Sequence, residues 1–538
     1  MIIDNFYDDI DKSNFYLGLV SQVYRENSIV QVENLSWLGH RKIKAESLIP
    51  NTINYLVAVD STKGLFIGEV FQSRVSNSDS VHDCMNSGFT ENVYPEMSID
   101  IISLMKPGDT TFKLAGFRTV GITDKVYIAN KKIVEEYLKS LEIEKGTSEA
   151  PLPSFAKFSN LENQDILLKP STLFDRHIMA LGTTNSGKST SSLSILDKLV
   201  KDKKKVLIID PTGEYANSFS DDEVKKLKLG SDTVLSVAEL SIQQWSMLFE
   251  TNDATQPAVL SDAIKSLRYQ KKNSISGTYK KEGQLVSKVM GDMTSVGPKD
   301  KDFLLSDLPS QISLETNQVD RGGNKYISST FQFNTHQWLV QKVQNKLDNT
   351  CFTDFFSNDT KKSNLMSELD KFAGSQTTSL YIDTSDIGTT DGIGGMVIDL
   401  VSNYLVDKKK GDFHPFVLFV DEVHRYTRTS DSDNDYYTGL VSIAREGRKK
   451  GIFLFLTTQN PQDVSTVLLG QVGTLLIHRL TQSDELKAIQ NHLGNNILGQ
   501  IRKLNRGEAV LTSINLLQDI HLRIDKCTRS HDNDTPLL

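Results

Sequence analysis

Residues 182–190 have the sequence Gly-Thr-Thr-Asn-Ser-Gly-Lys-Ser-Thr, which fits the phosphate-loop pattern G-x-x-x-x-G-K-[ST]. This pattern is informative only between a strand and a helix, and both are expected here. Residues 176–181 form a short, mostly apolar run typical of a buried strand, and residues 191–200 have the apolar spacing of a helix. The alternative is a Gly/Ser/Thr-rich turn that matches by chance, and the flanking elements disfavour it.

Each part of this loop has a physical role in binding phosphate. Gly182 and Gly187 permit backbone angles that a side chain resists. The loop N–H groups and the helix N-terminus together present positive potential to an anion. Lys188 is expected to reach the β and γ phosphates, and the Ser189 hydroxyl to bind Mg²⁺. The residues expected to contact the nucleotide are therefore Gly182, Thr183, Thr184, Asn185, Ser186, Gly187, Lys188, Ser189 and Thr190.

A second apolar run ends in two acids and supplies the other half of a nucleotide hydrolase site. Residues 415–422 are Pro-Phe-Val-Leu-Phe-Val-Asp-Glu, which predicts a buried strand with Asp421 and Glu422 at its end. Asp421 is expected to hold Mg²⁺ directly or through water. Glu422 is expected to orient and deprotonate the attacking water. Strands ending in Asp-Glu are common by chance, but much less so in a chain with a well-placed phosphate loop.

Two further strands are predicted to end in polar residues beside the phosphate loop. Strand 204–210 ends in Asp210, with Glu214 shortly after it, and the carboxyl ends of parallel strands form the ligand edge of such a sheet. Either these acids approach Mg²⁺ or the attacking water, or Asp210 caps the turn and Glu214 is solvated. Gln459 follows the strand 452–458, where it is either a sensor of the γ-phosphate and its water or an ordinary polar strand end.

The rest of the chain shows two other patterns. Residues 12–130 hold short β-like runs separated by turns, which predicts a small barrel or sandwich with bends or bulges at Gly18 and Gly68. Residues 220–375 interrupt the α/β alternation with apolar residues at helical spacing, so we expect a mostly helical insertion with Trp338 in its core. The lysines of the insertion either contact a phosphate backbone or form solvated surface.

Composition narrows the class of protein. The chain has 538 residues, of which 38% are hydrophobic and 24% charged, and its net charge is −8. This charge argues against a general polycation but leaves a local basic channel open. Three distant cysteines, Cys84, Cys351 and Cys527, indicate neither a disulfide framework nor a zinc site. With no run of 18 apolar residues and no signal peptide, we expect a cytoplasmic protein without membrane association.

Several blocks, taken in order, resemble the HerA family of ATPases, within the FtsK–HerA branch of RecA-like P-loop motors and most like its bacterial defence-type members. The blocks are R-H-I-M-A-L-G-T-T-N-S-G-K-S at 176–189, I-D-P-T-G-E-Y at 209–215, V-D-E-V-H-R-Y at 420–426, A-R-E-G-R-K-K-G at 444–451, T-T-Q-N-P at 457–461, L-I-H-R-L-T at 476–481 and R-G-E-A-V-L at 506–511. Together they cover most of residues 160–525. One departure is Asn185, where the family usually has Gly, and Asn tolerates left-handed backbone angles well enough for the loop to survive.

The resemblance implies an α/β fold: a RecA-like P-loop ATPase core, a helical insertion and a small N-terminal β-barrel. The expected domains are 1–150 for the barrel and linker, 151–219 with 376–525 for the core, 220–375 for the insertion and 526–538 for the tail. It also implies a homohexamer that hydrolyses ATP with Mg²⁺ between subunits and moves double-stranded DNA. The partner is expected to be a nuclease or a sirtuin-like NAD hydrolase encoded nearby, in anti-phage defence or DNA processing.

The resemblance also suggests which arginines contact the nucleotide. Arg448, and less directly Arg445, lies where a neighbouring subunit can donate a guanidinium to the transferring phosphate. Arg176 and Arg479 are further nucleotide-contact candidates, and the alternative for each arginine is a surface salt bridge. Two functions therefore stay open. The chain is either a DNA translocase or an assembly scaffold whose ring organises an effector and whose ATPase is regulatory.

Overall fold

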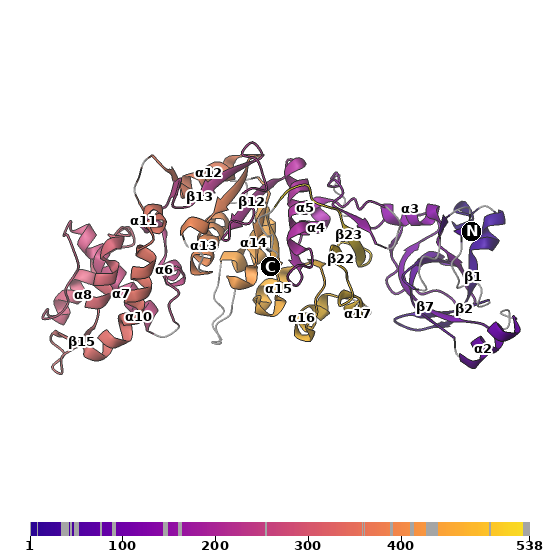
Figure 1. Cartoon of the computed structure of the whole chain (residues 1–538), viewed down its shortest axis with the longest axis horizontal. Helices are drawn as coiled ribbons and strands as arrows, with labels where there is room; N and C mark the ends of the chain where they lie inside the picture. Colours follow the sequence, from indigo (N-terminus) through magenta and orange to yellow (C-terminus); the bar gives the residue numbers. More distant parts are fainter. Residues whose placement is uncertain are drawn as a thin grey trace, which may run out of the picture. The chain divides into compact units, whose positions relative to one another are not determined.

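The computed structural model describes residues 2–7, 9–33, 42–43, 46–47, 53–75, 78–88, 93–143, 149–159, 164–252, 255–357, 359, 361–387, 391–408, 414–426, 439–493 and 497–530. The chain forms two compact units (Figure 1). The first unit comprises Met1–Leu173 and Thr474–Asp525, and the second comprises Phe174–Gly473 and Lys526–Leu538. Part of the expected linker and the last eight residues of the expected tail, 531–538, lie outside the described residues.

Six antiparallel strands of the first unit close into a barrel, which confirms the barrel expected at the N-terminus. The order around the barrel is β2-β1-β9-β5-β6-β7, and β7 pairs back onto β2. The bounds are β1 Tyr16–Val23, β2 Ser28–Val32, β5 Leu56–Ser61, β6 Gly64–Arg74, β7 Glu96–Met105 and β9 Lys125–Ile128. The barrel encloses a core of aliphatic side chains, including Leu17, Val30, Val57 and Ile67, all fully buried.

The barrel strands bend at the two glycines singled out in the sequence. The β1–β9 register shifts between Tyr16 and Gly18, and the β6–β7 register shifts between Ile67 and Gly68. A Cβ at Gly18 would lie 2.0 Å from the Gln31 carbonyl oxygen. These positions therefore require glycine because another strand passes too close for a side chain.

A smaller antiparallel group completes the first unit. Its strands lie in the order β10-β23-β22-β21. The bounds are β10 Ala156–Phe158, β21 Thr474–Ile477, β22 Glu508–Ser513 and β23 Ile520–Ile524. Residues 474–525, which the sequence assigned to the ATPase core, thus cluster with the N-terminal segment. A helix, α3 (Lys131–Lys139), follows the barrel and begins at an Asn130 side chain that accepts the Ile133 N–H.

Six parallel strands form the central sheet of the second unit, in the order β11-β20-β19-β12-β18-β13. The bounds are β11 Ile178–Leu181, β12 Lys205–Asp210, β13 Val224–Lys228, β18 Ser379–Asp383, β19 Phe416–Val420 and β20 Ile452–Thr458. Four of these strands, β11, β12, β18 and β19, are buried at every residue. Near-continuous apolar runs are typical of a parallel sheet covered on both faces. The sequence-based α/β fold with a RecA-like core is confirmed.

Helices pack on this sheet and extend into the insertion. Helix α5 (Lys188–Lys201) contacts β11 and β12, α14 (Gly439–Lys450) contacts β20, and α13 (Asp391–Asp407) packs on α14. The insertion holds α6 Ile242–Leu248, α7 Gln256–Lys272, α8 Val286–Thr294, α9 Leu308–Leu314, α10 Thr330–Leu347, α11 Thr350–Phe355 and α12 Leu365–Gly374. Helices α7, α8 and α10 lie together in one bundle (Figure 1). Strand β13 lies within the range assigned to the insertion, yet it pairs with the core strand β18.

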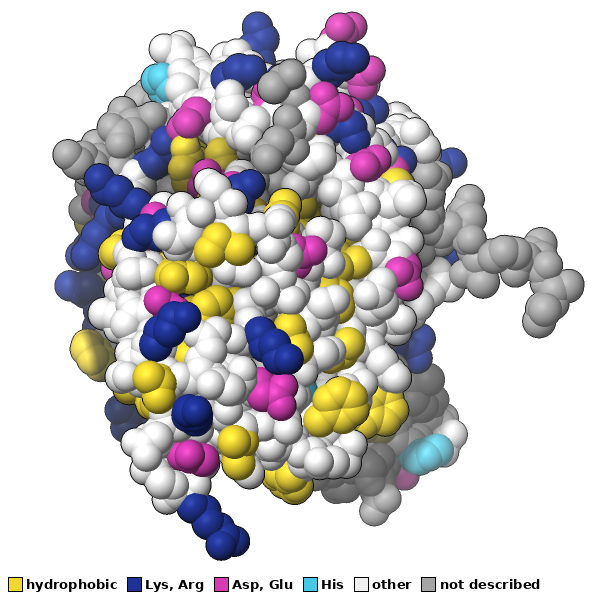
Figure 2. Space-filling view, turned by 90° about the vertical axis from the view of Figure 1, so that its left-hand side faces the viewer, with side chains coloured by type: hydrophobic (Ala, Val, Ile, Leu, Met, Phe, Trp, Pro, Cys, Tyr) yellow, Lys and Arg dark blue, Asp and Glu magenta, His cyan; other side chains and the backbone are white. Residues whose placement is uncertain are grey.

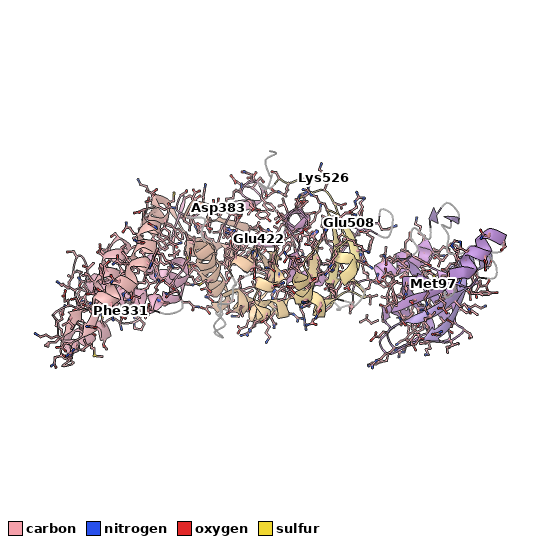
Figure 3. All side chains as sticks on the ribbon, turned by 60° about the horizontal axis from the view of Figure 1, so that its bottom comes forward. Met97, Phe331, Asp383, Glu422, Glu508 and Lys526 are labelled. Atoms are coloured by element: carbon pink, nitrogen blue, oxygen red, sulfur yellow. The ribbon has the colours of Figure 1, made fainter. Side chains whose placement is uncertain are left out.

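The expectation that Trp338 lies in the core is wrong. Its side chain is 70% exposed, while His336, Leu339 and Val343 make the buried face of α10. Phe331 at the start of the same helix is 81% exposed (Figure 3). Figure 2 shows hydrophobic and charged side chains intermingled on the face of the molecule that it draws. A large apolar residue on a helix is thus core only if its position matches the buried stripe.

Within the described part of the chain, no helix combines the length and apolar character needed to cross a membrane. Cys351 and Cys527 are both free thiols.

Candidate nucleotide-binding site

The phosphate loop joins β11 to α5, as its sequence predicts. Two of its residues have left-handed backbone angles, Asn185 at φ 65° and Gly187 at φ 108°. Helix α5 begins at Lys188, immediately after Gly187, so its first N–H groups have no intrahelical partner and can face an anion. Asn at a position that the family gives to Gly is therefore accommodated in the αL region, where Asn costs least after Gly.

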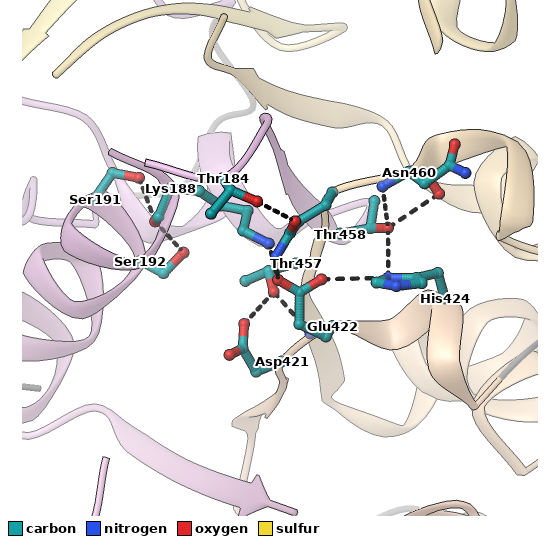
Figure 4. Close-up of polar contacts among 11 residues, drawn as sticks. Thr184, Lys188, Ser191, Ser192, Asp421, Glu422, His424, Thr457, Thr458 and Asn460 are labelled. Carbon is teal, nitrogen blue, oxygen red and sulfur yellow. Dashed lines mark hydrogen bonds and ion pairs between the residues drawn. The ribbon is translucent and has the colours of Figure 1, made fainter. Parts of the chain in front are cut away.

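Four side chains predicted to act on nucleotide meet above the ends of β11, β19 and β20 (Figure 4). The Lys188 ammonium, only 5% exposed, forms an ion pair with the Glu422 carboxylate. Gln459 Nε2 donates to Glu422 Oε1 at 2.8 Å, and Thr184 Oγ1 donates to Gln459 Oε1 at 2.7 Å. Residues from three separate motifs thus form one connected group of side chains.

The neighbouring carboxylate, Asp421, is held by a threonine that the sequence analysis did not assign. Asp421 is 6% exposed and accepts a hydrogen bond from Thr457 Oγ1. The same Thr457 hydroxyl accepts the Glu422 N–H at 2.9 Å. Glu422 has φ 47° and ψ 49°, a left-handed conformation that costs a non-glycine residue on the order of 1–3 kcal/mol and occurs mostly at functional sites.

Ser189 and Asp421 fit a Mg²⁺ site of the phosphate-loop type. Ser189 is partly buried in the first turn of α5, and Asp421 lies at the end of β19. Magnesium takes one or two protein oxygens in such sites and completes its shell with phosphate and water. A hydroxyl and one buried carboxylate are therefore a sufficient donor set, and their roles as ligands stay a prediction.

The two adjacent acids have opposite electrostatic environments. Burial raises the pKa of Asp421, and the neighbouring Glu422 carboxylate adds to this effect, against Lys188. Burial also raises the pKa of Glu422, but His424, Lys188 and Gln459 outweigh it and lower that pKa to about 2. Glu422 is consequently a carboxylate at any physiological pH, as a group that accepts a proton from water must be.

The structure gives different environments to Asp210 and Glu214, the two acids of the 209–215 block that the sequence analysis considered. Asp210 accepts five hydrogen bonds: from Thr212 N, Thr212 Oγ1, Gly213 N, Tyr215 N and the Tyr381 hydroxyl, at 2.8–3.1 Å. It is therefore a capping residue. Glu214 has a pKa raised to about 7 by burial and by the carboxylates of Asp421, Asp210 and Glu422. Both acids interact electrostatically with Asp421, and Glu214 interacts with Glu422 as well.

His424 is the other site residue that the sequence analysis missed. Its Nδ1 lies 3.2 Å from Glu422 Oε2 and 3.1 Å from Thr458 Oγ1 (Figure 4). It therefore links the catalytic acid to the end of β20. The feature that could have pointed to His424 is its position two residues after Glu422 in V-D-E-V-H-R-Y. Thr457 and Thr458 could have been found in the same way, because they begin the block T-T-Q-N-P.

The candidate arginines do not join this group in the described chain. Arg448 pairs with Asp175 at 3.3 Å, and its side chain is 51% exposed. The exposed Arg176 lies against Gly473, whose N–H donates to the Arg176 carbonyl at 2.6 Å. Arg479 is exposed and follows β21 in the first unit. Their roles in nucleotide contact stay predictions.

Most lysines proposed for a DNA surface have acidic partners within the chain. In the insertion the pairs are Lys271–Asp302, Lys272–Asp300, Lys280–Glu282 and Lys281–Glu315. Lys450 donates to the Val406 carbonyl at the end of α13, while Lys449 is exposed. Acidic neighbours lower the local positive potential that would attract a phosphate backbone to these lysines.

Residues 156–382 match the sequence model of the central domain of helicase HerA. This match covers less than half of the chain and shows similarity to that domain. A probable DNA double-strand break repair helicase HerA of Methanocaldococcus jannaschii is 21% identical, with 68% of this chain and 74% of the relative covered. The HerA of Sulfurisphaera tokodaii is 22% identical, with 65% of each chain covered.

Solved structures of lower sequence identity also resemble this chain. The bacterial conjugative coupling protein TrwB is 12% identical at a TM-score of 0.46, covering 72% of this chain and 97% of TrwB. VirB4 of Thermoanaerobacter pseudethanolicus is 16% identical at a TM-score of 0.45, covering 72% of this chain and 98% of VirB4. The HerA match and the site geometry identify the chain as a P-loop ATPase.

We expect Lys188 and Glu422 to be essential for different reasons. Lys188→Ala should weaken nucleotide binding and slow hydrolysis, because positive charge on the phosphates is lost. Glu422→Gln should slow turnover on the order of 10²–10⁴-fold. It should bind ATP at least as tightly as the wild type, because Lys188 no longer has a carboxylate partner.

Nucleotide titration and steady-state turnover of both variants provide the measurement. Glu446→Gln is the matched control, since Glu446 is an exposed glutamate of α14. Turnover of Glu422→Gln near the wild-type rate would contradict the assignment of Glu422 as the base.

Proposed function

We propose that this chain is an ATP-driven motor that moves double-stranded DNA as a homohexameric ring. The observation that carries the proposal is the group formed by Lys188, Glu422, Gln459 and Thr184. It places a phosphate-binding cation, a candidate base and a candidate sensor together in a HerA-type domain. Its relatives are named DNA double-strand break repair helicases, which favours duplex DNA as the substrate.

The chain's own residues perform the steps of hydrolysis as follows. Lys188 leaves Glu422 to bind the β and γ phosphates, which frees the carboxylate. Glu422 then orients and deprotonates the attacking water, while Gln459 stays within reach of both. Ser189 and Asp421 would hold Mg²⁺, which would supply charge neutralisation to the phosphates, and Thr457 holds the Asp421 carboxylate in place by its hydrogen bond. Gln459 follows β20 and contacts both Glu422 and Thr184 of the phosphate loop. Loss of the γ-phosphate therefore changes the contacts of β20 and of the phosphate loop together.

The alternative is an assembly scaffold that organises an effector without extensive translocation. Two observations favour it: the net charge of −8, and the acidic partners of most insertion lysines. A translocase needs a DNA channel lined by basic residues whose charge acidic partners do not cancel. Lys449 is an exposed candidate for such a lining.

Duplex DNA distinguishes the two functions. A translocase should hydrolyse ATP faster when duplex DNA is added, and its affinity for DNA should fall steeply between 50 and 200 mM salt, because phosphate contacts release counterions. ATPase assays and fluorescence anisotropy over a salt series provide the measurement. An intact ring with neither DNA stimulation nor salt-sensitive binding would favour the scaffold instead.

We also propose that the catalytic site is completed by a neighbouring subunit through Arg448. The side chain is half exposed and is held by a surface ion pair with Asp175. Such pairs are worth at most about 1 kcal/mol, so the guanidinium can be redirected at little cost. A guanidinium donated in trans raises phosphoryl-transfer rates by about 10³–10⁵-fold in other enzymes.

Mixed rings test whether Arg448 acts in trans. Arg448→Ala and Glu422→Gln subunits are each expected to be inactive alone. Mixing them should restore part of the ATPase activity, because some interfaces then pair an intact Glu422 with an intact Arg448. Glu446→Gln is the control on the same helix. No recovery in rings shown to exchange subunits counts against Arg448.

The barrel is proposed as the docking domain for a nuclease or a sirtuin-like NAD hydrolase, in the cytoplasm, in defence or DNA processing. Every nucleotide-site residue described above lies after residue 170. The barrel instead exposes an apolar loop: Phe117 is fully exposed, Ile122 is 64% exposed and Leu114 is 54% exposed. Exposed apolar residues of this kind favour a protein partner over solvent.

A loop variant tests the docking assignment. Phe117→Ser with Ile122→Ser should abolish co-purification of the protein encoded by the neighbouring gene, because the apolar contact is removed. The ATPase activity of the isolated ring should be unchanged. Retention of the partner by this double variant, at wild-type stoichiometry, argues that docking lies elsewhere.

A further inference from the structure

Arg529 in the C-terminal tail is buried in a set of polar contacts that the motor function does not explain. Its side chain is 12% exposed although it lies nine residues from the end of the chain. The guanidinium donates to Asp197 through Nε at 2.5 Å and to both oxygens of Glu223 at 2.9 and 2.6 Å. Bidentate arginine–carboxylate pairs are among the stronger and more geometrically specific polar contacts in proteins.

Further contacts fix the tail at the same place. Arg529 also donates to the Ser218 carbonyl at 3.0 Å, and its guanidinium lies 4.6 Å from the centre of the Phe219 ring. The Ser218 hydroxyl donates to the Ser530 carbonyl at 2.7 Å. The donors of the guanidinium are therefore largely used by two segments that both lie more than three hundred residues before Arg529 in the sequence.

Each of those two segments carries residues of the candidate nucleotide site, and we call the two segments its walls. Asp197 lies on α5, the helix that begins with Lys188 and Ser189. Glu223 ends the segment 211–223, which carries Glu214 next to the catalytic acids and Tyr215 packed on Phe419 at 5.4 Å. A helix rises 1.5 Å per residue and is stiff, so a shift at Asp197 is carried to Lys188.

We propose that Arg529 is a positioning residue for the nucleotide site, holding α5 and the segment 211–223 at a fixed spacing by neutralising Asp197 and Glu223 together. The inference rests on the proposed ATPase mechanism and extends it to the tail. Without Arg529, no cation bridges the two carboxylates: Asp197 keeps Lys198 and Lys201, which both lie on α5, and Glu223 loses its bidentate partner. The walls then separate, and Lys188 and Glu214 shift relative to each other.

The chain offers a matched control on the same carboxylate. Lys201 Nζ binds Asp197 Oδ2 at 2.9 Å, but Lys201 is 51% exposed and lies on α5 itself. Lys201→Ala therefore removes an ion pair to Asp197 without separating the two segments. If Arg529 acted only as one more surface charge, the two substitutions would have similar effects.

Four full-length variants test the proposal: Arg529→Gln, Arg529→Lys, Lys201→Ala, and Arg529→Gln with Glu223→Gln. The measurements are the Kd of a fluorescent ATP analogue with Mg²⁺, the KM and kcat of ATP hydrolysis, and the thermal unfolding midpoint. Arg529→Gln should raise Kd and KM about tenfold or more, since misplacing reacting groups by 1 Å costs on the order of 10²-fold. Arg529→Lys should lie between it and the wild type.

The double variant should recover part of the lost affinity, because it removes the unpaired charge of Glu223, and Lys201→Ala should stay within about twofold of the wild type. Wild-type Kd and KM in folded Arg529→Gln, or equal losses in Lys201→Ala, overturn the proposal. If Arg529→Gln does not fold, a wild-type Kd in Arg529→Lys, which cannot form the bidentate contact, overturns it as well. A wild type that binds the analogue without hydrolysing ATP refutes the motor function instead, and the Kd comparison still decides the role of Arg529.

Discussion

The ion pair between Lys188 and Glu422 is the interaction on which the rest of the site depends. It joins the first residue of α5 to the end of β19, and these elements come from motifs more than two hundred residues apart. The two side chains meet because β20 lies between β11 and β19 in the sheet and brings both strand ends to one edge. Strand order, more than any single residue, therefore creates the catalytic geometry.

The same pair gives the two adjacent acids different chemistry. Asp421 is buried against Thr457, and this burial raises its pKa. Glu422 is directed toward Lys188, Gln459 and His424, which favour its charged form. Two neighbouring carboxylates with pKa values pushed in opposite directions are suited to different tasks, one as a metal ligand and one as a base. Glu422 adopts a left-handed backbone conformation immediately after Asp421.

Sequence reasoning succeeded where a short-range pattern determines the structure. The phosphate loop, the apolar strands of the sheet and the acids at their ends all follow from local periodicity and strand-end chemistry. The glycine bulges of the barrel follow from the same logic. His424 and Thr457 could not be assigned in this way, because their roles depend on which strand lies beside which. The prediction that Trp338 lies in the core failed for a related reason. A residue on a helix is buried only if another element packs on that side of the helix.

The division of the chain also has a consequence for how motion reaches the site. The backbone passes between the two units after residues 173, 473 and 525. The first link leads within a few residues to β11 and the phosphate loop. At the second, Gly473 packs on Arg176, immediately before β11. The third leads to Arg529 and its contact with α5. Because all three links enter the second unit near β11 or α5, any force that the chain transmits through them reaches the elements that carry the predicted phosphate-binding residues.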